Sequence, residues 1–63
     1  MIEGLVGRAH VFPDGASLLI KEIKRRDENQ HWVTYIIDYG HGIPIKYVME
    51  YMEFIATYGH LFP

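Results

Sequence analysis

Apolar residues recur at every second position along most of this chain, which is the periodicity of strands that bury one face. The densest run is residues 31–40, where β-branched and aromatic side chains dominate, as is typical of strands. The same pattern predicts a first strand over residues 5–12, a second over 17–25 and a fourth over 44–48. We therefore expect the chain to be organised around the strand at 31–40.

Three short polar or glycine-rich segments separate these runs and predict tight turns. Pro13-Asp14-Gly15 combines a residue with a preset φ, a side chain that bonds back to the backbone and a residue that accepts positive φ. Residues 27–30 are all polar, and Gly40-His41-Gly42 ends the central run. Strands joined by such short turns run antiparallel, so the sequence predicts a four-stranded antiparallel meander.

The periodicity changes to that of a helix near Glu50, and Gly59 is a typical helix stop. The apolar side of this helix consists of Tyr51, Phe54, Ile55 and Tyr58. A helix that starts near Pro44 is an alternative, because proline suits a first helical turn and a polar stripe with helical spacing follows it. The members of that stripe are Lys46, Glu50, Glu53 and Thr57.

The predicted fold class is mainly β (β+α): a four-stranded antiparallel meander bent into a small SH3-like barrel, with a short C-terminal helix. The alternative is an α+β fold in which a three-stranded sheet packs against one longer C-terminal helix. A chain of 63 residues corresponds to one small globular domain, residues 1–63.

The register of the second and third predicted strands follows from keeping apolar residues together on one face. With Arg25 opposite His31, one face pairs Ile23 with Val33, Lys21 with Tyr35, and Leu19 with Ile37. The other face pairs Lys24 with Trp32, Glu22 with Thr34, and Ile20 with Ile36. The predicted core consists of Leu19, Ile23, Val33, Tyr35, Ile37 and Phe54.

The opposite face of the predicted sheet has no evident cover, because one helix covers only one face. Its apolar residues are Leu18, Ile20, Trp32 and Ile36. Hydrophobic residues make up 49% of the chain, and so short a domain buries only about 60% of its unfolded surface. We predict that this face binds a partner protein or a second copy of the chain, with Trp32 as the anchor. The alternative is that the N-terminal segment or the last four residues cover it.

The net charge of −2 argues against generic binding to a phosphate backbone. One local cluster favours a nucleic acid, and it consists of Lys21, Lys24, Arg25 and Arg26. Trp32 lies nearby and is able to stack on a base, as in single-strand binders. The alternative is a charged strand that blocks aggregation of sheets, and the acidic pair Asp27-Glu28 beside the cluster favours this interpretation.

Patterns typical of catalysis or metal binding are absent from the sequence. The histidines are His10, His31, His41 and His60, and none has helical ligand spacing or a His/Cys motif. Ser17 and Thr34 have no evident base, and no glycine-rich phosphate loop is present. We therefore expect no metal, no cofactor and no enzymatic activity.

Cysteine is absent, which suits a reducing compartment. No apolar run approaches the roughly 20 residues of a membrane span, and the N-terminus lacks the pattern of a signal peptide. We expect a cytoplasmic protein with no membrane partner.

Two resemblances add to this picture. The three hairpin turns and the closing pattern of Phe54, Tyr58, Leu61 and Phe62 resemble short phage and prophage proteins with SH3-like barrels. Residues 33–40, which end in Ile37-Asp38-Tyr39-Gly40, are similar to the strand-turn of Tudor domains, but the N-terminal half lacks the aromatic positions of a methyl-arginine cage. The first resemblance implies a small accessory or modulator protein, phage-encoded and located in the host cytoplasm, that acts by binding.

Overall fold

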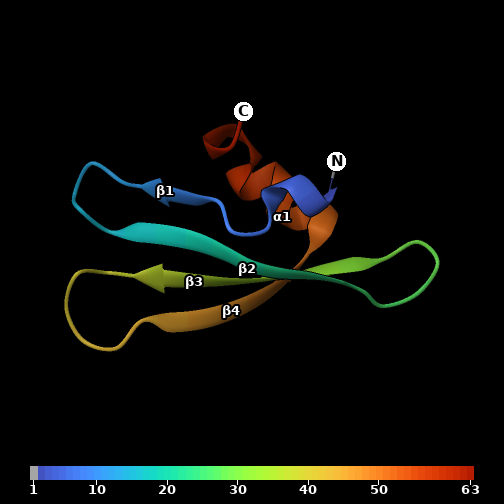
Figure 1. Ribbon diagram of the computed structural model, residues 1–63, viewed down its shortest axis with the longest axis horizontal. Helices are drawn as coiled ribbons and strands as arrows, with labels where there is room; N and C mark the ends of the chain where they lie inside the picture. Colours follow the sequence, from blue (N-terminus) through green and yellow to red (C-terminus); the bar gives the residue numbers. More distant parts are fainter. Residues whose placement is uncertain (1) are drawn as a thin grey trace.

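The computed structural model describes residues 2–63, with side chains from residue 4 onwards (Figure 1). Its elements are η1 (Ile2–Leu5), β1 (Ala9–Val11), β2 (Ser17–Arg25), β3 (His31–Asp38), β4 (Ile45–Glu50), α1 (Tyr51–Tyr58) and η2 (Gly59–Leu61). The strands form one antiparallel sheet, and both helical termini of the chain lie on the same side of it in Figure 1.

The sheet has the strand order β1-β2-β3-β4, so each strand pairs with its neighbours in sequence. This confirms the predicted four-stranded antiparallel meander with a short C-terminal helix. Residues 45–50 pair with β3 as a strand, so the alternative with three strands and a longer helix is not what forms. The sheet is open, with β1 and β4 as its two edges, and closure into an SH3-like barrel is not confirmed.

The turns use the predicted chemistry. In the turn between β1 and β2, the Asp14 carboxylate accepts a hydrogen bond of 3.0 Å from the Ala16 amide, and Gly15 has φ +93°. In the turn after β3, the Asp38 carboxylate accepts a bond of 2.9 Å from the amide of Gly40, whose φ is +87°. Both glycines therefore stand where an L side chain would be strained.

The first strand is shorter than predicted. Residues 5–8 were expected to be extended, but Leu5 ends η1 and Gly7 has φ +89°, so the chain turns before β1 begins at Ala9. The turn is held by hydrogen bonds from the Arg8 amide to the Leu5 carbonyl (3.1 Å) and from the Gly7 amide to the Ile20 carbonyl (2.8 Å). The apolar alternation over 5–8 therefore reflects packing of Leu5 against the core, since Leu5 is partly buried there.

A β-bulge at Lys21 changes which side of β2 faces the core. The pairs Arg25 with His31, Lys24 with Trp32, Ile23 with Val33 and Glu22 with Thr34 form as predicted. Lys21 then has no partner, and the next pairs are Ile20 with Tyr35, Leu19 with Ile36, and Leu18 with Ile37. The predicted pairs of Lys21, Leu19 and Ile20 are therefore wrong, because one extra residue in β2 moves every side chain before it to the opposite face.

The bulge corrects both the predicted core and the predicted interface. Leu18 and Ile20, expected on the uncovered face, have no exposed surface at all and form the centre of the core. Leu19, expected in the core, is 39% exposed on the other face. Val33, Tyr35, Ile37 and Phe54 are buried as predicted, and Ile23 is partly buried against them.

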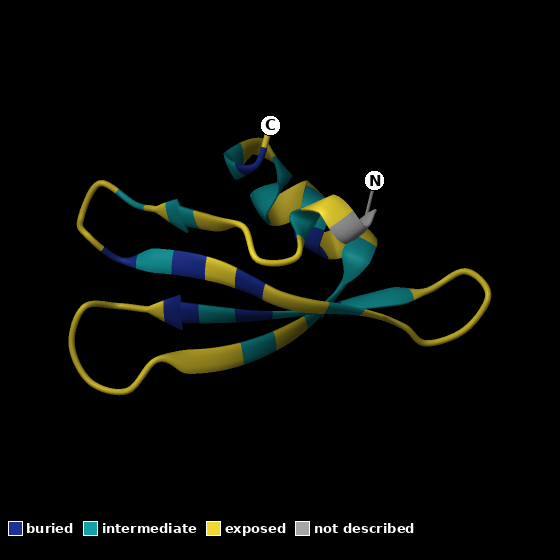
Figure 2. Ribbon diagram, viewed as in Figure 1, coloured by how far each residue is buried: buried dark blue, intermediate teal, exposed yellow. Residues whose placement is uncertain are grey.

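Helix α1 packs on the core face of the sheet, mainly against β3 and β4. The Glu50 carboxylate caps its N-terminus by accepting hydrogen bonds from the amides of Met52 (3.0 Å) and Glu53 (3.2 Å). Phe54 on α1 is fully buried, and its ring lies 5.2 Å from the ring of Tyr35 on β3. Figure 2 shows the buried segments of the sheet concentrated in the two middle strands, β2 and β3. The core cluster consists of Leu18, Ile20, Val33, Tyr35, Ile37, Phe54 and Phe62.

Two substitutions at adjacent positions test the bulge. Ile20→Ala removes a fully buried side chain and should lower the free energy of unfolding by about 2–5 kcal/mol. Leu19→Ala removes a side chain on the exposed face and should cost about 1 kcal/mol or less. Chemical denaturation of both variants measures the difference. A larger loss at Leu19 than at Ile20 would contradict the bulged register.

Candidate functional site

The face of the sheet opposite α1, called the outer face here, carries the candidate interaction surface. On this face β3 presents Trp32, Thr34 and Ile36, and β4 presents Lys46 and Val48. The helical elements α1, η1 and η2 supply residues that pack against the core cluster on the other side, namely Leu5, Tyr51, Ile55, Tyr58 and Leu61. Within residues 4–63 the outer face therefore keeps only the sheet's own side chains.

An apolar patch forms the centre of the outer face. Leu19 lies directly opposite Ile36, and Val48 lies opposite Thr34 beside them. Leu19 is 39% exposed and Val48 is 56% exposed, while Ile36 and Trp32 are half-buried. We call Leu19, Trp32, Ile36 and Val48 the outer patch. Two of its residues, Trp32 and Ile36, were predicted from the sequence, and Leu19 and Val48 take the places predicted for Leu18 and Ile20.

Trp32 stands at one end of the outer patch with cations around it. The guanidinium of Arg26 lies over the indole, 5.2 Å from the ring centroid, and Lys24 is the direct cross-strand neighbour of Trp32. Together with Glu22, Arg25, Thr34 and Val48, these residues line a depression of about 300 Å³. The depression therefore combines a flat aromatic floor with positive charge and a single acidic group.

The indole N–H of Trp32 has no hydrogen-bond partner among the described residues, and its nitrogen is shielded from solvent. A buried donor without a partner costs about 1–3 kcal/mol. Trp32 is the only tryptophan in the chain, and its indole on the outer face carries a donor that is unpaired among the described residues.

The predicted basic cluster is only partly brought together. Lys24, Arg25 and Arg26 line the depression at Trp32, but Lys21 lies at the bulge beside Thr34 and Lys46. Arg25 also donates a hydrogen bond of 3.1 Å from Nε to the carbonyl of Asp27, which ties it to the hairpin turn. The cluster is thus a three-residue corner at the end of the sheet rather than a continuous basic stripe.

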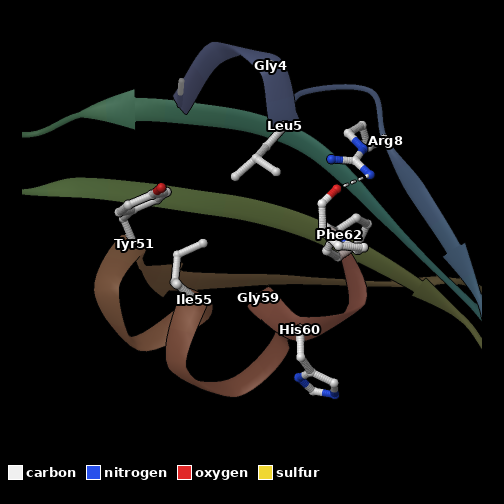
Figure 3. Close-up of a pocket in the computed structure, with 9 residues that line it drawn as sticks. Gly4, Leu5, Arg8, Tyr51, Ile55, Gly59, His60 and Phe62 are labelled. Carbon is white, nitrogen blue, oxygen red and sulfur yellow. Dashed lines mark hydrogen bonds between the residues drawn. The ribbon is translucent and has the colours of Figure 1, made fainter.

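A wider groove of about 710 Å³ lies between η1 and α1 (Figure 3). Leu5 points across it toward Tyr51 and Ile55, and the His60 imidazole points away. Arg8 closes one end, where its guanidinium lies 5.6 Å from the Phe62 ring centroid and donates a hydrogen bond of 3.4 Å to the Pro63 carbonyl. The groove thus runs between two packed helical elements, and its lining combines Leu5, Ile55 and Phe62 with the polar side chains of Arg8, Tyr51 and His60.

A tyrosine cluster occupies the core face near the turn after β3, and sequence reasoning missed it. The ring of Tyr35 lies 5.3 Å from that of Tyr47 and 5.6 Å from that of Tyr58. The hydroxyls of Tyr39 and Tyr47 share a hydrogen bond of 3.0 Å. Burial raises the pKa of Tyr35 to about 12, with the adjacent Tyr58 adding to the shift, and the bond to Tyr47 raises the pKa of Tyr39. Tyr35 and Tyr39 therefore stay protonated at neutral pH.

The histidines serve as packing groups or lie on the surface. His10 packs edge-on against Phe12, with ring centroids 5.0 Å apart, and His31 packs against Tyr51 at 6.5 Å. His41 and His60 are exposed. Among the described residues, no three histidine, cysteine or acidic side chains gather closely enough to hold a metal ion. The search for a long apolar helix able to cross a membrane finds none in the described part of the chain.

Comparison with known proteins returns no relative: no family model, no curated protein and no solved structure matches this chain.

Alkaline pH should weaken the fold through Tyr35. The unfolded chain releases this phenolic proton near pH 10, whereas the folded protein holds it to about pH 12. The folded state therefore binds more protons in that interval, so the free energy of unfolding falls as the pH rises from 10 to 12. Tyr35→Phe should flatten this decline in denaturation curves measured at pH 9 to 11. An unchanged slope in the variant would contradict the assignment.

Proposed function

We propose that this chain is a small non-enzymatic interaction domain that binds a protein through the outer face of its sheet. The observation that carries the proposal is the outer patch: Leu19, Trp32, Ile36 and Val48 gather on a face that no described helix covers. A domain this small gains stability from every apolar side chain that it buries, so a gathered patch left exposed indicates association.

The composition of the outer patch favours a protein partner. Its apolar centre is bordered by Glu22, Lys24 and Lys46, which is the arrangement of an apolar core with a polar rim. Trp32 is its largest side chain, and tryptophan is strongly enriched among residues that dominate binding energy. A flat sheet face suits another protein surface better than a small molecule, which requires an enclosed cavity.

Selection from a displayed random peptide library, with the purified domain as bait, tests the proposal. Recovered peptides should bind the wild type and lose about 2 kcal/mol or more of binding free energy with Trp32→Ala or Leu19→Lys. Met52→Lys is the matched control, because Met52 is exposed on α1, on the opposite side of the sheet from the outer patch. Circular dichroism verifies the fold of each variant. Peptides that bind all variants equally, or no recovered peptide at all, would contradict the proposal.

A second candidate is single-stranded nucleic acid bound at the Trp32 depression. The specific observation in its favour is the stacking of Arg26 on Trp32 with Lys24 alongside, since base-stacking sites combine an aromatic platform with cations. The net charge of −2 and Glu22 within the depression oppose it.

Tryptophan fluorescence distinguishes this second candidate, because Trp32 is the only tryptophan. Stacking of a base on Trp32 should quench its emission during titration with oligothymidine, and the binding constant should fall steeply as salt increases. Lys24→Ala should reduce the slope of log K against log salt by about one unit. We expect the protein-binding proposal to hold and the emission to remain unchanged. Salt-sensitive quenching would instead establish the nucleic-acid function.

A further inference from the structure

The outermost strand β4 leaves one side without a hydrogen-bonding partner. It pairs with β3 along its whole length, and within the described residues Ile45–Met49 make no backbone hydrogen bond outside that ladder. Its other side is open, and Ile45 and Val48 are about half exposed. A strand edge with free backbone groups is a template for another strand.

The two edges of the sheet differ. The β1 edge is only three residues long, with a positive-φ glycine at Gly7 before it and Pro13 after it. Such a short, interrupted strand is poorly suited to pairing with another chain. β4 has six residues, no bulge, and proline only before its start, at Pro44. Charged side chains usually block the pairing of such an edge, and β4 carries two of them, Lys46 and Glu50.

The order of residues in β4 is self-complementary. Two copies of β4 related by a twofold axis perpendicular to the sheet run antiparallel, keep their faces aligned and place one residue opposite itself. With Val48 as that residue, Lys46 of each copy lies opposite Glu50 of the other. Oε1 of Glu50 caps α1, and its Oε2 accepts no hydrogen bond from the described residues, so this second oxygen faces the lysine. On the core face, Tyr47 lies opposite Met49 of the second copy. Charged residues thus meet opposite charges, and apolar residues meet apolar ones.

Neighbouring registers lack this match. Centring the pair on Lys46 places the two lysines opposite each other, which is destabilising. Centring it on Tyr47 places Lys46 opposite Val48 and Glu50 opposite Pro44, which has no amide proton to donate. Centring it on Met49 places Lys46 opposite Met52, where α1 has already begun. Only the register centred on Val48 pairs both charges, and it keeps residues 46–50 of both strands within the ladder.

We propose that two copies of this chain associate through antiparallel pairing of their β4 strands about Val48, which joins the two sheets into one continuous sheet. The partner at this edge is a second copy because the charge pattern of β4 complements itself. Val48 belongs to both surfaces, but the pairing uses the free backbone groups of the β4 edge, so it does not depend on which molecule the outer patch binds.

Sedimentation equilibrium over a concentration series tests the association. The wild type should dimerise, and Lys46→Glu, which places like charges opposite each other twice, should raise the dimer dissociation constant about tenfold or more. Lys21→Glu is the matched control, because it makes the same charge change at the bulge of β2 and should leave the constant unchanged. A strictly monomeric wild type, or equal effects of the two variants, would overturn the proposal.

Cross-linking tests the register. The chain contains no cysteine, so Val48→Cys introduces a single thiol, and the paired Cβ atoms would lie about 4.5–5.5 Å apart. A short bis-thiol cross-linker should join Val48→Cys chains efficiently and should leave Val11→Cys chains, with their thiol at the β1 edge, largely monomeric. A dimeric protein in which Val48→Cys fails to cross-link, or cross-links no better than Val11→Cys, would refute the β4 edge. The peptide selection tests binding at Trp32 and Leu19, whereas sedimentation and cross-linking test pairing of the β4 strands. Failure of the protein-binding proposal is therefore distinguishable from failure of the dimer proposal.

Discussion

The structure depends on the single extra residue in β2. Lys21 has no partner in the ladder. After it, the odd-numbered residue Ile23 faces the core, whereas before it the even-numbered residues Leu18 and Ile20 do so. Leu18, Ile20 and Ile23 therefore all face the core, although their spacing of two and then three residues fits no regular strand. Without the bulge, one of the two ends would bury polar groups and expose aliphatic ones. The bulge therefore places an aliphatic side chain of β2 opposite each of the buried residues Val33, Tyr35 and Ile37 of β3.

Much of the fold was predictable because it depends on short-range chemistry. The turns follow from Asp14-Gly15 and Asp38 with Gly40, whose carboxylates and positive φ angles act within a few residues. The bulge was not predicted, although the adjacent polar residues Lys21 and Glu22 inside an apolar alternation are its signal. In a regular strand adjacent residues point to opposite faces, so either Lys21 or Glu22 would point into the core. A bulge between them allows both side chains to face solvent.

The candidate surface was predicted in part for the same reason. Trp32 and Ile36 lie on β3, whose alternation is regular, so their face followed directly from the sequence. Leu18 and Ile20 lie before the bulge and were assigned to the wrong face, and Leu19 replaces them. The proximity of Arg26 to the indole depends on how the hairpin turn folds back, and the tyrosine cluster depends on long-range packing of α1. No local pattern encodes either.

The outer patch and the β4 edge are adjacent, and this links the two proposals. On the outer face, Glu50 lies between Trp32 on β3 and the open side of β4. In the proposed dimer, Lys46 of the second copy lies opposite Glu50, so the ion pair stands beside the depression at Trp32. Leu19, Ile36 and Lys46 are cross-strand neighbours on the outer face. In the dimer this line of neighbours would continue across the new strand pair to Glu50 and then Trp32 of the second copy. Pairing at β4 would thus bring the two outer patches onto one surface, and a binding partner would contact both at once with the gain in affinity that multivalency provides.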